Sequence, residues 1–167
     1  TEEAIALREA GVVAPILVLE GPQSEDELLL MADMALWPTL HHAEQLAWCG
    51  QHASLLSAAW LKVDTGMHRL GFSADALPQA ISALQATGIT DITLMSHLAT
   101  AEYPEAELTR LQQGVWHEQL TDWPAAASLH NSAAARTQSE GRSDWARIGY
   151  ALYGGQIKGL TPDETLR

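Results

Sequence analysis

Residues 60–72 bring together side chains that could act on a charged ligand. Lys62 stands inside an apolar run, Asp64 follows it, and Arg69 comes shortly afterwards between two glycines. If the run is a parallel strand covered on both faces, the Lys62 ammonium must find a partner or lose its charge. Arg69 keeps its charge, so it needs solvent, a carboxylate or an anionic group of a ligand. The segment therefore predicts a ligand-binding loop after a buried strand; the alternative is an arginine that merely covers the rim of a barrel.

Apolar runs and helical patterns alternate along the whole chain. Short apolar runs predict strands at residues 15–19, 37–40, 58–63, 91–96, 125–129 and 146–148. Apolar spacing, capping residues and flanking glycines or prolines predict helices at residues 2–10, 25–34, 41–54, 78–87, 104–120 and 132–136. This alternation is typical of an α/β fold with a parallel sheet, and it fits both a (β/α) barrel and an open doubly wound sheet.

Residues suited to ligand binding follow several of the predicted strands: Arg69, His97, Asn131, Ser132 and Gly149. Barrel enzymes place their active sites in the loops after the carboxyl ends of the strands, and these loops converge on one face. An open sheet would concentrate its ligand contacts at one switch point instead. The distribution therefore favours the barrel.

The net charge of −12 disfavours several classes of partner. With 9 Lys and Arg against 21 Asp and Glu, the chain lacks the clustered positive patch that nucleic acid or an anionic membrane requires. No run approaches roughly 18 consecutive apolar residues, and the acidic first residues are unlike the basic start of a signal peptide. Cys49 is the single cysteine, which excludes an internal disulfide and a cysteine metal site. We therefore expect a cytoplasmic protein without a bound metal.

Several strings in the chain resemble one family. KVDTGMHRLGF at residues 62–72 is similar to the KxDTGMxRLG string of bacterial alanine racemases, which depend on pyridoxal phosphate and have fold type III. The other similar segments are SHLATAE at 96–102, NSAA at 131–134, RIGYALYG at 147–154 and residues 2–21. They occur in the family's order and together cover essentially the whole chain. On this resemblance the chain is identified as a central fragment of the family's N-terminal barrel domain.

The resemblance implies a (β/α)8 barrel of the TIM type, followed in the family by a C-terminal β domain. About six of the eight strands fall within this sequence, so the barrel is expected to be incomplete, with its first strands and the β domain missing. Residues 1–155 would form the partial barrel that binds the cofactor. Residues 156–167 would begin the linker to the β domain.

The resemblance also implies a reaction. Such a protein would interconvert L-alanine and D-alanine through an aldimine with pyridoxal 5′-phosphate by two-base proton transfer, and would supply D-alanine for cell-wall peptidoglycan. Alanine is the expected substrate, and the full-length protein is expected to be a homodimer that binds neither nucleic acid nor membrane. The alternatives are a serine or broad-specificity amino-acid racemase of the same fold, and a non-catalytic barrel that binds pyridoxal phosphate.

The family's cofactor-binding residues carry over onto matching positions. Neither GxxxxGK[ST] nor GxGxxG occurs, so a phosphate would have to be held without such a loop. The resemblance implies that the hydroxyl of Ser132 and the main-chain N–H groups of Gly149 and Tyr150 bind it. Glycine lets a backbone approach a ligand closely, and the alternative for Gly149 is a tight turn. Leu19 would pack on the cofactor ring, with Asn131 as a polar neighbour.

The resemblance gives three residues supporting roles in catalysis. Arg147 would donate a hydrogen bond to the cofactor's pyridine nitrogen, which keeps that nitrogen unprotonated and makes the ring a weaker electron sink. Arg69 would lie beside the cofactor's phenolic oxygen and the substrate carboxylate. His97 would lie against Arg147 and link it to a catalytic tyrosine; the alternative is a hydrogen-bonded packing histidine. Lys62 is expected to be carbamylated, because a carbamate replaces a costly buried cation by an anion that can hold Arg69.

The sequence also departs from the family pattern. Tyr150 stands where a smaller aliphatic residue is common, and His130 stands where a small residue is usual. The family's Schiff-base lysine, within a KANAYGHG-like string, and the catalytic tyrosine of its C-terminal domain are both absent from these 167 residues. Lys62, Lys158 and Tyr153 have the wrong sequence context for these roles. The chain by itself is therefore predicted to be inactive.

Overall fold

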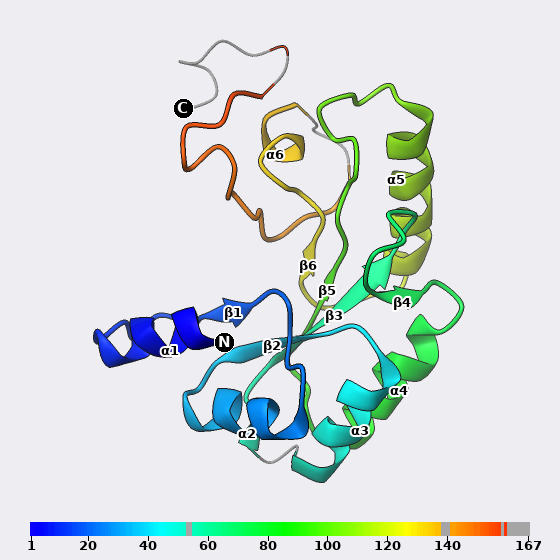
Figure 1. Cartoon of the computed structure of the whole chain (residues 1–167). Helices are drawn as coiled ribbons and strands as arrows, with labels where there is room; N and C mark the ends of the chain where they lie inside the picture. Colours follow the sequence, from blue (N-terminus) through cyan, green and yellow to red (C-terminus); the bar gives the residue numbers. More distant parts are fainter. Residues whose placement is uncertain (53–54, 138–140, 158, 160–167) are drawn as a thin grey trace. The chain divides into compact units, whose positions relative to one another are not determined.

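Helices and strands alternate in the structure, a computed structural model that describes residues 1–52, 55–137, 141–157 and 159 (Figure 1). The helices are α1 (Glu2–Glu9), α2 (Glu25–Asp33), α3 (Ala43–His52), α4 (Leu77–Ala86), α5 (Glu107–Leu120) and α6 (Ala134–Thr137). The strands are β1 (Leu17–Val18), β2 (Trp37–Leu40), β3 (Ala59–Asp64), β4 (Phe72–Ser73), β5 (Ile92–Met95) and β6 (Ala127–Ser128). The predicted alternation is confirmed, although most elements are shorter than the sequence pattern indicates.

The sheet has the strand order β1-β2-β3-β5-β6, and β4 pairs with β3 outside this path. Parallel register pairs are Leu17 with Trp37, Thr39 with Trp60, and Leu94 with Ala127. The first five residues of β3 and all residues of β5 are buried. A parallel strand covered on both faces needs apolar side chains at successive positions, which is why these strands read as continuous apolar runs in the sequence.

Two strands differ from the prediction. The sequence pattern does not predict β4, because a strand of two residues is too short to show a period. The predicted strand at 146–148 is wrong: Arg147 forms only an isolated parallel bridge with Asn131, and Ile148 is 40% exposed. Two apolar residues around one arginine do not distinguish a strand from an extended loop. The end of the predicted helix 41–54, the Lys158 position and most of the predicted linker 156–167 lie outside the described residues.

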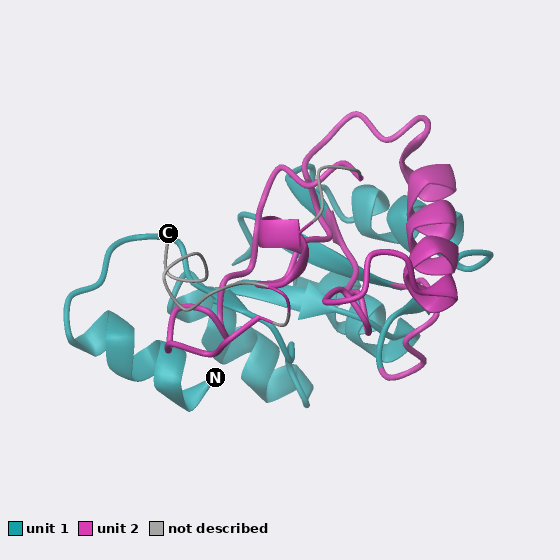
Figure 2. Ribbon diagram, turned by 90° about the horizontal axis from the view of Figure 1, so that it is seen from above, with its two compact units in different colours: residues 1–63, 70–93 teal, residues 64–69, 94–167 magenta. Residues whose placement is uncertain are grey.

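The chain forms two compact units, which Figure 2 shows in separate colours. Unit 1 contains residues 1–63 and 70–93; unit 2 contains residues 64–69 and the described part of 94–167. The sequence does not predict this division. The loop 64–69 therefore belongs to the same unit as His97, Asn131, Ser132 and Arg147, whereas Leu19 and Lys62 belong to unit 1.

The start of α2 shows how the local sequence sets a helix in unit 1. The hydroxyl of Ser24 accepts a hydrogen bond from the Glu27 amide at 3.2 Å, and the Glu27 carboxylate accepts one from the Gln23 amide at 2.6 Å. These bonds satisfy N–H groups that have no partner within the helix. Leu28 and Met31 then lie about one turn apart on the buried face of α2. Ser24 and Glu27 thus cap α2 together, and Glu27 reaches the residue before the cap.

The loop after β1 is fixed by a close approach of Gly21 to β2. Gly21 has φ +70°, and a Cβ at this position would lie 1.9 Å from the carbonyl oxygen of Thr39. The buried side chain of Gln45 on α3 donates to the carbonyl of Pro22 at 2.9 Å and accepts from the amide of His41 at 2.7 Å. Backbone contact and a buried amide thus hold the same loop from two sides.

Gly21→Ala should lower the free energy of unfolding by about 2–4 kcal/mol, because it adds both left-handed strain and a backbone clash. Gly11→Ala is the matched control, since Gly11 has φ +88° but open space around a built Cβ. The control should lose only about 1–2 kcal/mol from backbone strain. Urea unfolding followed by circular dichroism measures both losses. Equal losses in the two variants would contradict a close approach at Gly21.

Candidate functional site

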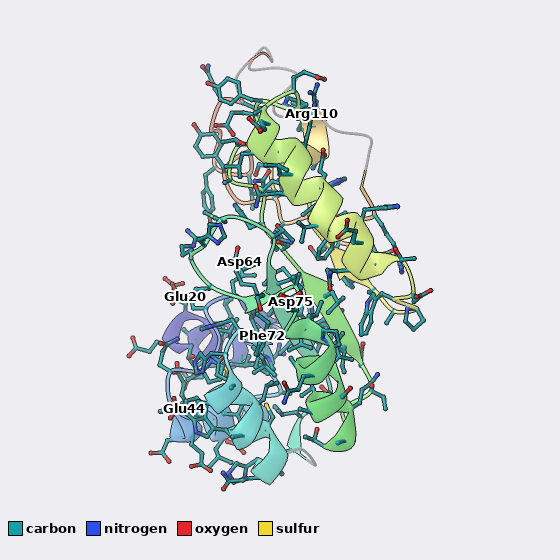
Figure 3. The ribbon with its side chains drawn as sticks, turned by 90° about the vertical axis from the view of Figure 1, so that its right-hand side faces the viewer. Glu20, Glu44, Asp64, Phe72, Asp75 and Arg110 are labelled. Carbon is teal, nitrogen blue, oxygen red and sulfur yellow. The ribbon has the colours of Figure 1, made fainter. Side chains whose placement is uncertain are left out.

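Asp64, at the end of β3, holds the loop 64–69 through its carboxylate (labelled in Figure 3). Oδ1 accepts hydrogen bonds from the amides of Gly66 at 2.9 Å and His68 at 3.0 Å, and Oδ2 lies 3.1 Å from Nδ1 of His68. His68 has φ +55°, a left-handed conformation that costs free energy in a residue with a Cβ. The carboxylate therefore stabilises a strained turn immediately before Arg69.

These contacts make the loop sensitive to acid. Partial burial raises the pKa of Asp64, but the amides of His68 and Gly66 and the His68 ring outweigh burial, so the pKa lies below its ordinary value. A carboxyl whose pKa is lowered by folding stabilises the folded state above its unfolded pKa, and this stabilisation is lost as the pH falls through the folded pKa.

Asp64→Ala should lower the free energy of unfolding at pH 7 by about 1–2 kcal/mol, as the loss of a capping side chain does. The difference from the wild type should shrink as the pH falls below about 4, because the unfolded wild-type chain binds a proton at Asp64 there, and it should vanish once the folded carboxyl is protonated too. Asp75→Ala, at an exposed aspartate, is the control and should change little. Urea unfolding at several pH values provides the comparison. A difference that stays constant down to acid pH would argue against a stabilising Asp64 carboxylate.

Arg69 ends this loop with an exposed side chain. Within the described part of the chain, its guanidinium makes no hydrogen bond or ion pair. In a chain of net charge −12, such an arginine is suited to bind an anionic group from outside the unit. The Arg69 guanidinium is thus open to solvent and to a ligand.

Arg147 lies at the centre of a group of main-chain carbonyls. Nη1 donates to the carbonyl of Ser128 at 3.0 Å and to the Ser128 hydroxyl. Nη2 donates to the carbonyl of Ser96 and, at 3.5 Å, to that of Leu129. Burial lowers the pKa of Arg147 to about 10, so the guanidinium still carries its charge near neutral pH. Carbonyl groups at the ends of β5 and β6 therefore hold the Arg147 guanidinium in one orientation.

His97 lies between Arg147 and Asn131. Its Nδ1 is 3.4 Å from Nη2 of Arg147, and its Nε2 is 3.5 Å from Nδ2 of Asn131. The Asn131 amide is oriented by other groups, because Nδ2 donates to the Leu98 carbonyl at 3.1 Å and Oδ1 accepts from the Ala134 amide at 3.0 Å. Since an arginine can only donate, a hydrogen bond to His97 requires an unprotonated Nδ1. The contact of His97 with Arg147 expected from the resemblance is thus present; its catalytic role stays a prediction.

Ser132 and the loop that follows Arg147 form a second part of this site. The hydroxyl of buried Ser132 accepts a hydrogen bond from the Ala151 amide at 3.1 Å, which holds the loop against the start of α6. Among the described residues, the N–H groups of Gly149 and Tyr150 have no hydrogen-bond acceptor. Both residues are exposed, and the O–H of buried Ser132 donates to no described acceptor. These three donors are therefore suited to oxygen atoms of a ligand.

A tight turn does not explain why residue 149 is a glycine. Its φ is not positive, and a Cβ built on it meets no atom within 4 Å. The backbone and the surrounding protein would therefore tolerate a side chain at this position, but a side chain would fill the open space beside the two N–H groups. This favours close approach of a ligand over the turn as the reason for glycine.

The remaining predicted site residues lie in unit 1. Leu19 follows β1 and is 51% exposed, which suits an apolar contact with a ligand. Lys62 lies in β3 and is only 7% exposed. Burial lowers the pKa of His41, and the positive charge of Lys62 adds to this effect. Lys62 is therefore a buried amine inside unit 1, as the sequence predicts; its carbamylation stays a prediction.

Carbamylation of Lys62 can be tested through His41. A carbamate would replace the nearby positive charge by a negative one, so the pKa of His41 should rise when bicarbonate is added. NMR titration of His41 with and without ¹³C-bicarbonate measures this shift, and a carbamate carbon signal should appear with it. Lys62→Gln should remove both signals. A full-length, bicarbonate-equilibrated protein with neither signal would exclude the modification.

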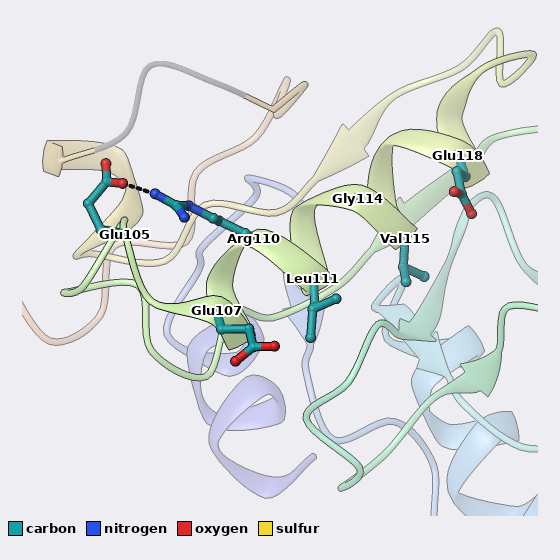
Figure 4. A pocket seen from close by; sticks show the side chains of 7 residues that line it. All are labelled: Glu105, Glu107, Arg110, Leu111, Gly114, Val115 and Glu118. Carbon is teal, nitrogen blue, oxygen red and sulfur yellow. Dashed lines mark hydrogen bonds and ion pairs between the residues drawn. The ribbon is translucent and has the colours of Figure 1, made fainter.

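A surface pocket of about 580 Å³ lies elsewhere, on α5 (Figure 4). It is lined by Glu105, Glu107, Arg110, Leu111, Gly114, Val115 and Glu118. Arg110 is paired with Glu105, so the remaining charges are carboxylates that would repel a phosphate. None of the predicted site residues lines this pocket, and we assign it no part in the chemistry.

The fold and the candidate site together describe a parallel α/β protein with a buried arginine and exposed main-chain N–H groups near the ends of its strands. A comparison with family models matches residues 1–157 to "Alanine racemase, N-terminal domain". The chain belongs to this family, and its fold is that of an incomplete α/β barrel of the TIM type.

Individual relatives agree with this assignment. The alanine racemase of Azoarcus sp. strain BH72 is 39% identical over 172 residues, which are 99% of this chain and 49% of that protein. The alanine racemase structure from Acinetobacter baumannii matches with a TM-score of 0.88 and 31% identity over 98% of this chain and 50% of that one. The Bartonella henselae alanine racemase with covalently bound pyridoxal phosphate matches with a TM-score of 0.81 and 26% identity, over 96% and 49% of the two chains.

The chain thus spans about half the length of the curated relatives that it matches. Among the described residues, every helix is too short or too polar to serve as a membrane span.

Proposed function

We propose that this chain is the cofactor-binding part of a pyridoxal-phosphate-dependent racemase that interconverts L-alanine and D-alanine. The observation that carries the proposal is the cluster in unit 2, where Arg147 contacts His97 and the ends of β5 and β6, and where the N–H groups of exposed Gly149 and Tyr150 have no described acceptor. Membership of the alanine racemase family supports alanine as the substrate. D-Alanine made in this way would supply cell-wall peptidoglycan.

The residues of unit 2 fit the cofactor. Ser132, Gly149 and Tyr150 would hold its phosphate by one hydroxyl and two main-chain N–H groups, which needs no lysine. Arg147 would donate to the ring nitrogen. When bound, pyridoxal phosphate withdraws electrons from the substrate's α-carbon and so makes its proton removable.

The chain's own residues would limit that electron withdrawal. Arg147 is held by carbonyls and keeps its charge, so it offers only hydrogen-bond donors to a ring nitrogen. A nitrogen that accepts a hydrogen bond without being protonated leaves the ring a weaker electron sink, which favours fast return of the proton over side reactions. Arg69, exposed at the end of the loop 64–69, would bind the substrate carboxylate. The roles predicted for three further residues are unchanged. Leu19 and Asn131 would be neighbours of the cofactor, and Lys62 would be carbamylated.

The two proton-transferring residues would come from outside these 167 residues. By the resemblance they are a lysine that binds the cofactor and a tyrosine contributed by the partner subunit of a homodimer. His97 would connect Arg147 to that tyrosine. A racemase of serine or of several small amino acids, and a non-catalytic pyridoxal-phosphate-binding barrel, remain as alternatives because no described residue fixes the size of a substrate pocket.

The test is to follow both enantiomers of alanine and serine in the full-length protein with pyridoxal phosphate. We expect alanine to racemise with the higher kcat/KM. Faster turnover of serine would show that the protein is a serine racemase. Cofactor binding without turnover of any amino acid would show that it is a non-catalytic barrel. Absence of cofactor binding would overturn the proposal altogether.

Ser132→Ala tests the phosphate site separately. The variant should bind pyridoxal phosphate about 10–100-fold more weakly, the loss expected for one hydrogen bond to a charged group. Ser82→Ala is the control, because the Ser82 hydroxyl on α4 only bonds the Pro78 carbonyl of its own helix. Cofactor absorbance measured against free pyridoxal phosphate gives both affinities.

A further inference from the structure

A buried glutamine on α5 has no part in the site described so far. Gln112 is 0% exposed and lies on the inner stripe of the helix with Thr109, Trp116 and Leu120, all of them buried. Such a stripe normally carries apolar side chains, and a buried amide is tolerated only where its hydrogen bonds are made.

The Gln112 amide bonds two loops of unit 2 at once. Its Oε1 accepts from the Ala99 amide at 2.9 Å, and its Nε2 donates to the His97 carbonyl at 2.9 Å. Nε2 also lies 3.3 Å from the hydroxyl of Thr65, which in turn is 2.8 Å from the hydroxyl of Ser96. One side chain therefore joins the loop 64–69, the backbone of His97 and the residue two places after it.

The same glutamine packs against the turn of the first loop. A Cβ on Gly66 would lie 3.4 Å from Cγ of Gln112. Gly66 is also one of the two residues whose amides Asp64 binds. The loop that ends in Arg69 is therefore held by Asp64 from within and by Gln112 from α5.

We infer that Gln112 is a positioning residue, which fixes the loop of Arg69 relative to His97 and so sets the geometry of the racemase site. This inference rests on the proposed function for its catalytic consequence. An amide is suited to the task because it accepts from one loop while it donates to the other. Glutamate would keep the acceptor but lose both donors, and leucine would lose all three contacts.

A purely structural glutamine would affect stability alone, and the helix offers a matched control. Thr109 lies one turn before Gln112, is equally buried, and bonds the carbonyl and hydroxyl of Thr100, both at 2.9 Å. It makes no described hydrogen bond to the loop 64–69 or to His97. Thr109→Val therefore removes buried hydrogen bonds of the same helix to Thr100, and it leaves the loop 64–69 and the backbone contacts of His97 and Ala99 with Gln112 intact.

The experiment compares Gln112→Leu, Gln112→Glu and Thr109→Val in the full-length holoenzyme. Both Gln112 variants should lower kcat for alanine by about 10–100-fold at a temperature where all proteins are folded, as small misplacements of catalytic groups do. Thr109→Val should lower the melting temperature but leave kcat within about twofold. Combining Gln112→Leu with Thr65→Val should add little to the loss, because both changes break the same connection.

A second measurement does not depend on catalysis. Hydrogen exchange of the Ala99 amide in cofactor-free protein should become faster in Gln112→Leu and stay slow in Gln112→Glu, which keeps the Oε1 acceptor. If Gln112→Leu does not fold, Gln112→Glu decides the question, with a lower kcat and a protected Ala99 amide expected. Unchanged kcat in the Gln112 variants would overturn the inference. The proposed function would be refuted instead if the exchange rates of the variants are as expected but the wild type racemises no amino acid.

Discussion

Arg147→Glu should slow alanine racemisation in the full-length holoenzyme by about 100-fold or more and should raise the share of turnovers that end in transamination. A carboxylate at this position would favour a protonated ring nitrogen, which strengthens the cofactor as an electron sink. The proton would then return more slowly and less selectively to the substrate carbon. The ratio of transamination to racemisation is the decisive quantity.

That ratio matters because Arg147 also supports the fold. Its guanidinium donates to the carbonyls of Ser96, Ser128 and Leu129, and a glutamate would place acceptors against these acceptors. The variant should therefore melt at a lower temperature, and total activity will fall with the fraction folded. The ratio of the two products does not depend on the amount of folded protein.

Arg147→Lys is the control for charge. Lysine keeps the positive charge but lacks the fork that reaches several carbonyls together. We expect slower racemisation in Arg147→Lys without a rise in transamination. Equal product ratios in the wild type and Arg147→Glu would remove Arg147 from its role beside the ring nitrogen.

Much of the fold was predictable because its strands are buried on both faces. The apolar residues of β3 and β5 stand next to one another in the sequence. The helix between them, α4, has a proline in its first turn and buried apolar residues at helical spacing. The predicted strand at 146–148 fails for the converse reason. Arg147 bridges Asn131 at a single point while its neighbour Ile148 is 40% exposed, and three residues carry no period that would reveal this.

Residues of the candidate site could be predicted only where they stand in recognisable strings. Arg147, His97 and Ser132 carry over from the family motifs, and the structure places them in one unit. Gln112 belongs to no such string. A signal was nevertheless present in the sequence, because Thr109 and Gln112 are polar residues on a helical stripe completed by Trp116 and Leu120. Polar residues at core positions of a helix mark hydrogen bonds that must be made elsewhere in the fold.

Which loops Gln112 joins could not be read from its position in the sequence. Its partners Thr65 and Ala99 are 47 and 13 residues away in the sequence. Gln112 can bond both of them only because the loops that follow β3 and β5 lie in the same unit. For the same reason the sequence does not reveal that 64–69 belongs to unit 2 while the rest of β3 belongs to unit 1.

The 167-residue chain alone should form no D-alanine from L-alanine, even when saturated with pyridoxal phosphate. The sequence contains no KANAYGHG-like string to provide a Schiff-base lysine and no tyrosine in the context of the second base. Without residues that remove and return the α-proton, cofactor binding cannot complete a turnover. This argument predicts loss of activity whether or not the chain is well folded.

The low stability expected of the isolated chain is a second, independent reason to predict that it is inactive. In the described sheet, β1 and β6 stand at the ends of the strand order. Asp144 and Trp145 satisfy the N–H and the carbonyl of Ala127 on the outer edge of β6, whereas no described strand pairs with the outer edge of β1. A further strand at either edge would normally bury several side chains at about 1.5–3 kcal/mol each, comparable in sum with the roughly 5–15 kcal/mol that holds a domain folded. We therefore expect the isolated chain to be partly folded or to aggregate.

The measurement is D-alanine formation by the purified chain with pyridoxal phosphate and L-alanine, beside a full-length relative at equal concentration. Cofactor absorbance of Ser132→Ala against the unaltered chain reports in the same samples whether unit 2 retains its phosphate site. Binding that depends on Ser132, without turnover, is the outcome we expect if unit 2 folds. Turnover at even a small fraction of the relative's rate would mean that the proton-transferring groups lie within the chain. Lys62 and Tyr153, together with Lys158 outside the described residues, would then be the first residues to replace.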